Sequence, residues 1–153
     1  MRIEPRMNIP DEIMRTATVH WSGDIAHGKG SIATESGKVK ADYSFGTRFS
    51  NEPGTNPEEL LGASHAACFS MALSLALTRA GHAPASIDTT ASVKLAKSAD
   101  GFDITRIDLT TTVVAPGLED PAFQELASGA KAGCPISKAL KAVPITLAAT
   151  LKS

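Results

Sequence analysis

The sequence of 153 residues contains only two cysteines, Cys68 and Cys134, too few for a disulfide-stapled scaffold. Its first residues, Met1 to Met7, carry charges of both signs and lack the apolar run of a secretory signal peptide. These two absences predict a cytoplasmic protein whose thiols stay reduced. In that compartment a lone pair of cysteines is more often catalytic or metal-binding than structural.

The chain also has little net charge and few aromatic residues. Its 15 basic and 16 acidic residues leave a formal net charge of −1, and neither sign forms a run. One Trp, one Tyr and five Phe offer little for a platform on which nucleobases could stack. We therefore expect no nucleic-acid partner. Because no glycine-rich phosphate loop or dinucleotide fingerprint occurs, we also expect no nucleotide cofactor.

Charge is missing altogether from one long segment, residues 60–78, which is long enough to span a bilayer. Several small or polar residues dilute it, and the sequence has no second segment of this kind. A helix that is apolar on every side can also form the centre of a water-soluble core, and we prefer that interpretation. We therefore expect no membrane partner.

The ends of this helix are marked by residues that favour helix termini. Asn56 suits the N-cap, Pro57 the first helical position, and Glu58 the positive end of the helix dipole. Gly81 then predicts the end of the helix near residue 80. The length is about 36 Å at 1.5 Å per residue.

The other elements follow from alternating apolar residues and from turn residues. Strands are predicted at 15–21, 30–35, 39–45, 86–97, 102–114 and 143–151, a loop at 46–55, and a second helix at 120–132 that can resume at 136–141 after Pro135. The order is β-β-β-α-β-β-α-β, an α+β fold with antiparallel hairpins. We expect a single domain at residues 14–153, preceded by a loosely ordered arm at residues 1–13.

The long helix also predicts a homodimer. It has few polar residues to face water, and small residues such as Gly62, Ala63 and Ala67 allow another backbone to approach closely. Such a helix needs cover on every side, and the chain has only one other substantial helix. A second copy of the chain is the simplest source of that cover.

A thiol in the middle of this helix needs help to react. Apolar surroundings raise a cysteine pKa, so Cys68 requires a nearby cation, and Arg48 in the preceding loop is the best candidate. A carboxylate at the helix start, Glu58 or Glu59, could pair with that arginine. Glu58 and Cys68 are about 15 Å apart along one straight helix. If both serve one site, Glu58 must come from the other subunit.

Taken alone, these residues also allow less specific roles. Cys68 could be inert packing, Glu58 a first-turn acid, Arg48 a solvated loop charge, and Cys134 a helix-end cysteine, although its place before Pro135 would lower its pKa. His65 lies one turn before Cys68 on the same helix face. No further ligands stand at a recognised spacing, so we expect no metal.

Residues 54–74, with the sequence GTNPEELLGASHAACFSMALS, closely resemble the OsmC branch of the OsmC/Ohr family of osmotically inducible and organic-hydroperoxide-resistance proteins. Further similar segments lie at 21–25, 31–37, 47–49 and 131–135. The resemblance covers about residues 15–153 in the same order. Residues 1–13 have no counterpart and represent either an arm on the dimer or the product of an upstream start codon.

The resemblance implies a cofactor-free thiol peroxidase that acts on organic hydroperoxides, and more weakly on hydrogen peroxide, in osmotic and oxidative stress defence. It implies an intertwined homodimer in which antiparallel sheets wrap two long central helices. By motif, Cys68 corresponds to the peroxidatic cysteine, Cys134 to the resolving cysteine, Arg48 to the activating arginine and Glu58 to its carboxylate partner. Cys68 would become a sulfenic acid, Cys134 would condense with it, and a dithiol would reduce the resulting disulfide.

Two further expectations concern the substrate. Phe45, Phe49, Phe69 and Met71 could line an apolar entrance that favours alkyl or lipid hydroperoxides. The rival function is a non-catalytic stress protein, or a binder of small apolar ligands, that uses the same dimer cavity. That protein would keep the fold but would need neither thiol.

Overall fold

The computed structural model describes residues 8–152. The chain divides after Asn56 into two compact units, and each is described by itself. Of the expected N-terminal arm, residues 1–7 lie outside the described part, while residues 8–16 contain neither helix nor strand. That this arm is loosely ordered stays a prediction.

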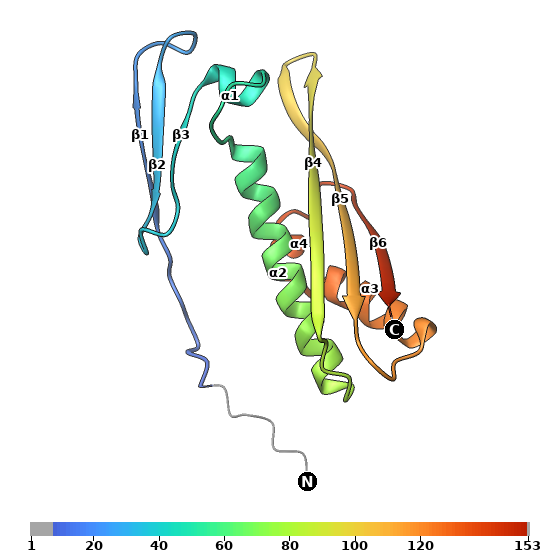
Figure 1. Cartoon of the computed structure of the whole chain (residues 1–153). Helices are drawn as coiled ribbons and strands as arrows, with labels where there is room; N and C mark the ends of the chain where they lie inside the picture. The colour runs from blue at the N-terminus through green and yellow to red at the C-terminus, as the bar shows by residue number, and fades with distance from the viewer. Residues whose placement is uncertain (1–7, 153) are drawn as a thin grey trace. The chain divides into compact units, whose positions relative to one another are not determined.

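The first unit is built on a three-stranded antiparallel sheet in the order β1-β2-β3 (Figure 1). Its strands are β1 (Ala17–Ser22), β2 (Lys29–Thr34) and β3 (Lys40–Tyr43). Trp21 and Tyr43 lie on these strands with ring centroids 5.4 Å apart. All three strands were predicted, each within about two residues of its observed ends.

A short helix, α1 (Phe45–Phe49), follows the sheet where the sequence predicted only loop. Ser44 and Thr47 form a reciprocal capping box: each side chain accepts a hydrogen bond from the other residue's backbone N–H. The loop prediction was therefore wrong for residues 46–49. Threonine in place of the usual Glu or Gln, together with helix-weakening Gly46, concealed this start signal.

The second unit begins with α2 (Pro57–Arg79), followed by the hairpin strands β4 (Ser86–Ser98) and β5 (Gly101–Val114). Helices α3 (Asp120–Gly133) and α4 (Pro135–Ala139) then lead to β6 (Ile145–Lys152). The sheet order is β4-β5-β6. Strand β6 pairs with β5 in parallel, so one pairing departs from the predicted antiparallel arrangement. The α3–α4 segment serves as the crossover that a parallel pair requires.

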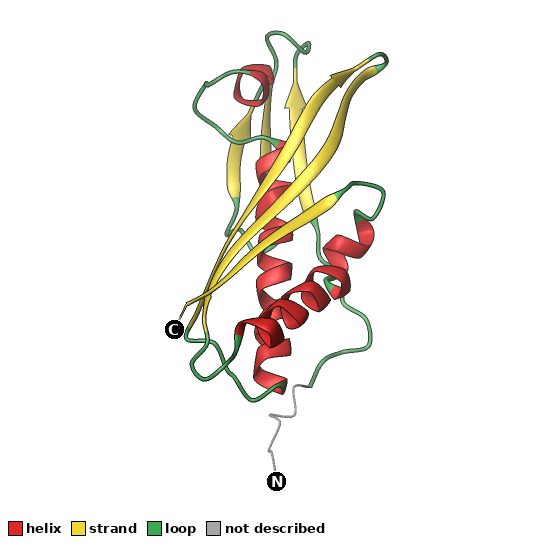
Figure 2. Ribbon diagram, turned by 90° about the vertical axis from the view of Figure 1, so that its right-hand side faces the viewer, coloured by secondary structure: helices red, strands yellow, loops and turns green. Residues whose placement is uncertain are grey.

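The core of the second unit lies between the sheet and the helices that cover one of its faces (Figure 2). Its largest fully buried apolar side chains come from α2, β5 and α3: Phe69, Leu73, Leu77, Ile107, Leu109, Val113 and Phe123. At the start of α2, a Cβ added to Gly62 would lie 3.2 Å from the Ala91 carbonyl oxygen. Glycine therefore allows α2 to approach β4 of the same chain closely, whereas Gly62 was predicted from the sequence to allow the approach of a second copy.

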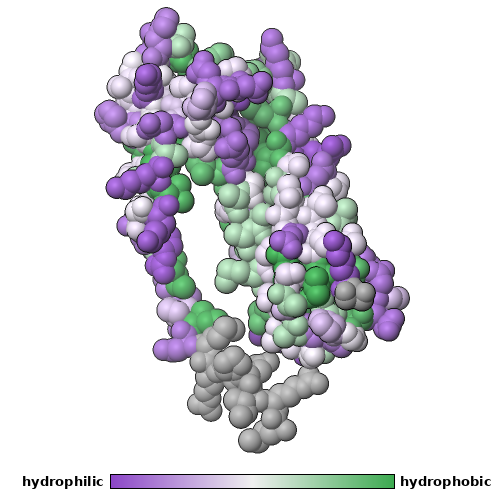
Figure 3. Space-filling model, in the orientation of Figure 1, coloured by the Kyte–Doolittle hydropathy of each residue, from purple (hydrophilic) through white to green (hydrophobic). Residues whose placement is uncertain are grey.

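On its opposite face, α2 is not covered by the described residues of the second unit. Ala63, Ala67, Met71 and Leu75 follow one another at four-residue spacing and are exposed, Met71 by 76% and Leu75 by 38%. Figure 3 shows hydrophobic to near-neutral colouring where α2 reaches the surface. Among the described residues, α2 is the one helix long and apolar enough to cross a membrane, a test that core helices also pass.

Candidate active site

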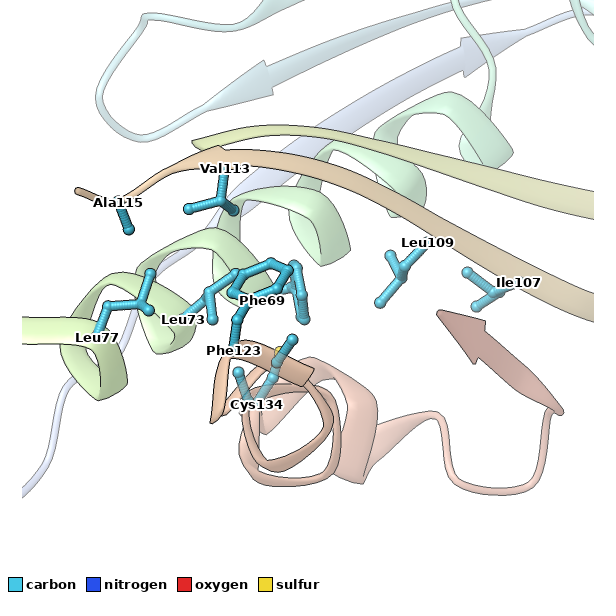
Figure 4. Packing of buried hydrophobic residues seen from close by; sticks show 11 residues of the cluster. Phe69, Leu73, Leu77, Ile107, Leu109, Val113, Ala115, Phe123 and Cys134 are labelled. Carbon is cyan, nitrogen blue, oxygen red and sulfur yellow. The ribbon is translucent and has the colours of Figure 1, made fainter. Parts of the chain in front are cut away.

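Both cysteines lie in the second unit, and both are free thiols. Cys68 is in the middle of α2 and is half-buried, whereas Cys134 lies between α3 and α4 and is fully buried. In Figure 4, Cys134 lies below Phe69 of α2 and close to Phe123 of α3, at the edge of the apolar core. The fold thus brings the second cysteine to the surface of α2 that carries the first.

The two thiols lie close enough to alter each other's pKa. The residues are 66 positions apart in the sequence, and the α3–α4 break brings them together. Two thiols this near each other can form a disulfide with little backbone movement. Both are sequence-predicted site residues, and the structure places them near each other.

The position of Cys134 follows from its neighbours. Helix α3 ends at Gly133, and Pro135 has no N–H with which to continue it, so Cys134 adopts non-helical angles of φ −57° and ψ 125°. Pro135 then occupies the first turn of α4. As a result, the Cys134 sulfur faces the N–H groups at the start of α4, which are not used by hydrogen bonds within the helix.

The pKa of Cys134 is lowered, although burial alone would raise it. Four groups together outweigh the effect of burial: the Cys68 thiol, the backbone N–H and the hydroxyl of Ser137, and the backbone N–H of Ile136. The Cys134 side chain nevertheless does not form the usual N-cap hydrogen bond of α4. Each contact favours the thiolate by placing a donor near its charge. This direction agrees with the prediction made from the position of Cys134 before Pro135.

The pKa of Cys68 is raised, first by burial and then by its contact with Cys134, which the backbone N–H of Ile136 only partly opposes. In mid-helix the backbone N–H groups are already used by the helix itself, so they cannot stabilise a thiolate. The sequence predicted this difficulty from the apolar surroundings of Cys68. Within its own unit, Cys68 is therefore the less acidic of the two thiols.

A buried polar pair that sequence reasoning missed lies beside the cysteines. The imidazole Nε2 of His65 is 2.8 Å from the hydroxyl Oγ of Ser137, and His65 is fully buried. Burial lowers the pKa of His65, which favours the neutral ring. The sequence considered His65 only as a metal ligand. Within residues 8–152 no three His, Cys, Asp or Glu side chains gather to hold a metal ion.

The other two predicted site residues lie on different elements. Arg48 is in α1 of the first unit, with its guanidinium carbon 5.3 Å from the centroid of the Phe49 ring. Glu58 is in the first turn of α2 and is half-buried. Because α2 is one uninterrupted helix, Glu58 and Cys68 of one chain are about 15 Å apart along it. The roles of Arg48 and Glu58 at Cys68 stay predictions.

The predicted apolar entrance needs one correction. Phe69 is fully buried in the core, so it cannot line an open entrance. Although Phe69 lies next to Cys68 in the sequence, its side chain points inward from α2, toward the core. Phe45 and Phe49 are partly exposed, with ring centroids 4.8 Å apart, and Met71 is exposed. Those three remain candidates for the entrance.

Comparison with known proteins identifies the family. Residues 49–148 match the family model described as OsmC-like protein. The chain is 55% identical over 142 residues to the peroxiredoxin OsmC of Escherichia coli strain K12, a match that covers 92% of this chain and 99% of the relative. The peroxiredoxin OsmC of Shigella flexneri matches to the same extent.

Solved structures agree with these sequence matches. The organic hydroperoxide resistance protein OhrB of Bacillus subtilis is 30% identical with a TM-score of 0.65, and the match covers 90% of this chain and 98% of OhrB. An OsmC-like protein of unknown function from Vibrio cholerae shares the fold, with a TM-score of 0.73 at 17% identity over 90% of this chain and 99% of its own. The chain belongs to the OsmC family.

Proposed function

We propose that this protein is a thiol-dependent peroxidase that reduces organic hydroperoxides to alcohols, and hydrogen peroxide more weakly. The observation that carries the proposal is the contact between Cys68 and Cys134, the only two cysteines of the chain. The relatives support it, because one is named a peroxiredoxin and another an organic hydroperoxide resistance protein. We expect it to act in the cytoplasm during osmotic and oxidative stress.

The reaction needs two thiols and an external dithiol. The Cys68 thiolate attacks the terminal peroxide oxygen, the O–O bond breaks, and the alkoxide leaves and takes a proton to become the alcohol. Cys68 is now a sulfenic acid, and the Cys134 sulfur displaces its hydroxyl group to form a disulfide and water. A cellular dithiol then reduces this disulfide by exchange and is itself oxidised. No metal or cofactor enters these steps.

Activation of Cys68 is assigned to Arg48 and Glu58. Because the surroundings of Cys68 in its own unit raise its pKa, a cation must supply the missing stabilisation. Arginine suits this role because it keeps its charge when partly buried and can pair with a carboxylate. Since Glu58 stands about 15 Å along α2 from Cys68 of the same chain, we assign the working Glu58 to a second subunit.

The uncovered face of α2 supports this homodimer. Ala63, Ala67, Met71 and Leu75 form an apolar stripe with small residues at one end, which would let a second backbone approach closely. A lipid bilayer is the other medium that could cover such a face. Sedimentation without detergent distinguishes them: a discrete dimer supports the proposal, whereas detergent-dependent solubility would favour a membrane.

The experiment that tests the function is steady-state turnover of an alkyl hydroperoxide with an added dithiol. Wild type should show saturable turnover, faster with the alkyl hydroperoxide than with hydrogen peroxide. Cys68→Ser should reduce turnover by at least about a thousandfold, as loss of a nucleophile does, while circular dichroism shows an intact fold. Cys134→Ser should consume one equivalent of peroxide and hold a sulfenic acid that a dimedone-type probe traps.

Two outcomes would contradict the proposal. Turnover that survives in Cys68→Ser would remove the assigned nucleophile, and a stable fold without saturable turnover would favour the non-catalytic ligand-binding protein.

The disulfide has its own check, since wild type treated with one equivalent of hydroperoxide should yield a Cys68–Cys134 bond within one chain. Mass spectra that contained only disulfides between chains would require a different resolving step.

A further inference from the structure

His65 is a buried ionisable residue for which the proposed peroxide chemistry has no role. Its side chain is fully buried on the face of α2 that carries Cys68, one turn away. Nε2 lies 2.8 Å from the Ser137 hydroxyl, while Nδ1 has no hydrogen-bond partner among the described residues. A buried histidine held by a single hydrogen bond is unusual, because buried polar atoms are normally satisfied.

The missing partner at Nδ1 indicates where the proton of the ring lies. A neutral imidazole has one N–H donor and one bare acceptor nitrogen. If Nδ1 carried the proton, a buried donor would be left unsatisfied, which proteins avoid more strongly than an unsatisfied acceptor. The proton therefore belongs on Nε2, which donates its hydrogen bond to the Ser137 oxygen.

This assignment also fixes the direction of the Ser137 hydroxyl. Its oxygen accepts from His65 Nε2, so its own hydrogen is available for another acceptor. Ser137 lies three residues after Cys134 in the first turn of α4, and its hydroxyl and backbone N–H both lower the pKa of Cys134. Ser137 is only 6% exposed, so water competes little for this donor.

We propose that His65 and Ser137 form a hydrogen-bond relay that directs the Ser137 hydroxyl at the Cys134 sulfur and thereby speeds disulfide formation. Both are positioning residues, because neither needs to touch the peroxide. Hydrogen bonds in series polarise one another, so the donation from His65 makes the Ser137 hydroxyl a stronger donor. The inference rests on the proposed function, in which Cys134 resolves oxidised Cys68.

The relay acts on one step of the cycle. Cys134 gives up its thiol proton, its sulfur bonds to Cys68, and the S–O bond of the sulfenic acid breaks. The departing hydroxyl takes a proton and leaves as water, so no further oxidant or reductant is needed. Ser137 stabilises negative charge on Cys134 before the new bond forms.

The first test measures two rates separately on the full-length protein. Mixing with one equivalent of alkyl hydroperoxide, followed by rapid alkylation and mass spectrometry, counts reduced, sulfenic and disulfide forms over time. Ser137→Ala and His65→Leu should each slow disulfide formation about tenfold, the scale of one hydrogen bond to a charged group. Formation of the Cys68 sulfenic acid should stay within about twofold of wild type.

Matched variants separate the relay from a packing role. Ser137→Thr and His65→Gln keep a donor at each position and should recover most of the rate. Ser70→Ala removes another half-buried hydroxyl, one on α2 that donates to Thr89, and should leave both rates unchanged. The double variant His65→Leu with Ser137→Ala should be no slower than Ser137→Ala alone, because the two groups act in series.

The second test uses the wild-type protein, so it does not depend on whether a variant folds. Two-bond ¹H–¹⁵N correlation spectra report the tautomer of each histidine, and His65→Gln assigns the His65 signals. A neutral ring with the proton on Nε2 supports the relay. A proton on Nδ1, a charged ring, or unaltered disulfide formation in folded Ser137→Ala would overturn it. Absence of Cys68 oxidation in wild type would overturn the proposed function instead, and the tautomer would still decide the relay.

Discussion

The two cysteines of this chain lie in contact, yet their surroundings differ. Cys68 is in the middle of a 23-residue helix whose backbone donors are already used. Cys134 lies at a break between two helices, where the N–H groups of Ile136 and Ser137 and the Ser137 hydroxyl face its sulfur. Burial acts on both thiols, but only around Cys134 do nearby donors outweigh it.

This difference shows which thiol the second unit can activate by itself. Residues 57–152, the described part of this unit, build an anion-stabilising environment around Cys134, which suits a thiol that must attack a sulfenic acid. They do not build one around Cys68, the thiol assigned to attack peroxide. The helper for Cys68 must therefore come from outside this set of contacts, and Arg48 and a second subunit's Glu58 are the proposed sources.

The test with the largest expected effect asks whether the second subunit supplies Glu58. Cys68→Ser and Glu58→Ala chains should each be inactive as homodimers. Unfolding and refolding them together should restore one site in each heterodimer, built from Cys68 of one chain and Glu58 of the other. Recovery should approach about a quarter of wild-type turnover, since half of the dimers are mixed and each has one working site.

Wild type carried through the same refolding is the control for this experiment. If it recovers while the mixture stays inactive, Glu58 and Cys68 do not meet across subunits. Glu58 would then be an ordinary first-turn acid, favoured there by the helix dipole alone.

The second test separates the subunits. Met71→Glu places a carboxylate on the exposed apolar stripe of α2, and burying it without a partner should weaken the dimer about a thousandfold. Peroxide turnover should fall with dimer content, because Cys68 loses its proposed helper. Sedimentation across a concentration series measures the dissociation constant. Ser128→Glu, on the exposed side of α3, is the matched control and should leave the dimer intact.

The sequence predicted both the long helix around Cys68 and the helix break beside Cys134, because the local signals for each were strong. Caps and breakers placed the long helix within a residue of its observed ends, and Pro135 correctly indicated a break beside Cys134. The parallel pairing of β6 with β5 was missed, because apolar periodicity identifies strands but not their neighbours. Helix α1 was missed because Thr47 is an uncommon partner in a capping box.

The site was predicted less evenly than the fold. Residue chemistry alone left Cys68 and Cys134 as possible packing residues, and the resemblance to the OsmC family supplied their roles. The His65–Ser137 pair escaped notice because its members are 72 residues apart and share no motif spacing. A single buried histidine beside a helical cysteine was its only signal in the sequence.

The third test asks whether Arg48 supplies the charge that Cys68 lacks. In a Cys134→Ser background, Arg48→Ala should raise the pKa of Cys68 and slow its reaction with peroxide about ten- to a thousandfold, because a nearby opposite charge alters the thiolate population by that amount. Arg48→Lys should be intermediate, since lysine keeps the charge but loses the planar fork. Absorbance at 240 nm follows the thiolate, and stopped-flow mixing gives the rate.

The reverse background provides the control. In Cys68→Ser protein, Arg48→Ala should leave the alkylation rate of Cys134 unchanged, because its donors come from α4. An equal loss of reactivity at both cysteines would mean that Arg48 acts on the fold rather than on Cys68. No change at Cys68 would remove Arg48 from the mechanism.

The smallest expected effect concerns the neutral histidine on the Cys134 side of the site. Burial lowers the pKa of His65 in the folded chain. As the pH falls below the ordinary histidine value of about 6.5, the unfolded chain binds a proton that folded His65 resists, so the free energy of unfolding should fall. The stability present above that pH is then lost on acidification. His65→Gln should make this dependence shallower. Urea unfolding at fixed protein concentration from pH 7.5 to 5 measures how steeply the free energy of unfolding changes with pH. The same dependence in wild type and His65→Gln would show that His65 accepts a proton as readily when folded as when unfolded.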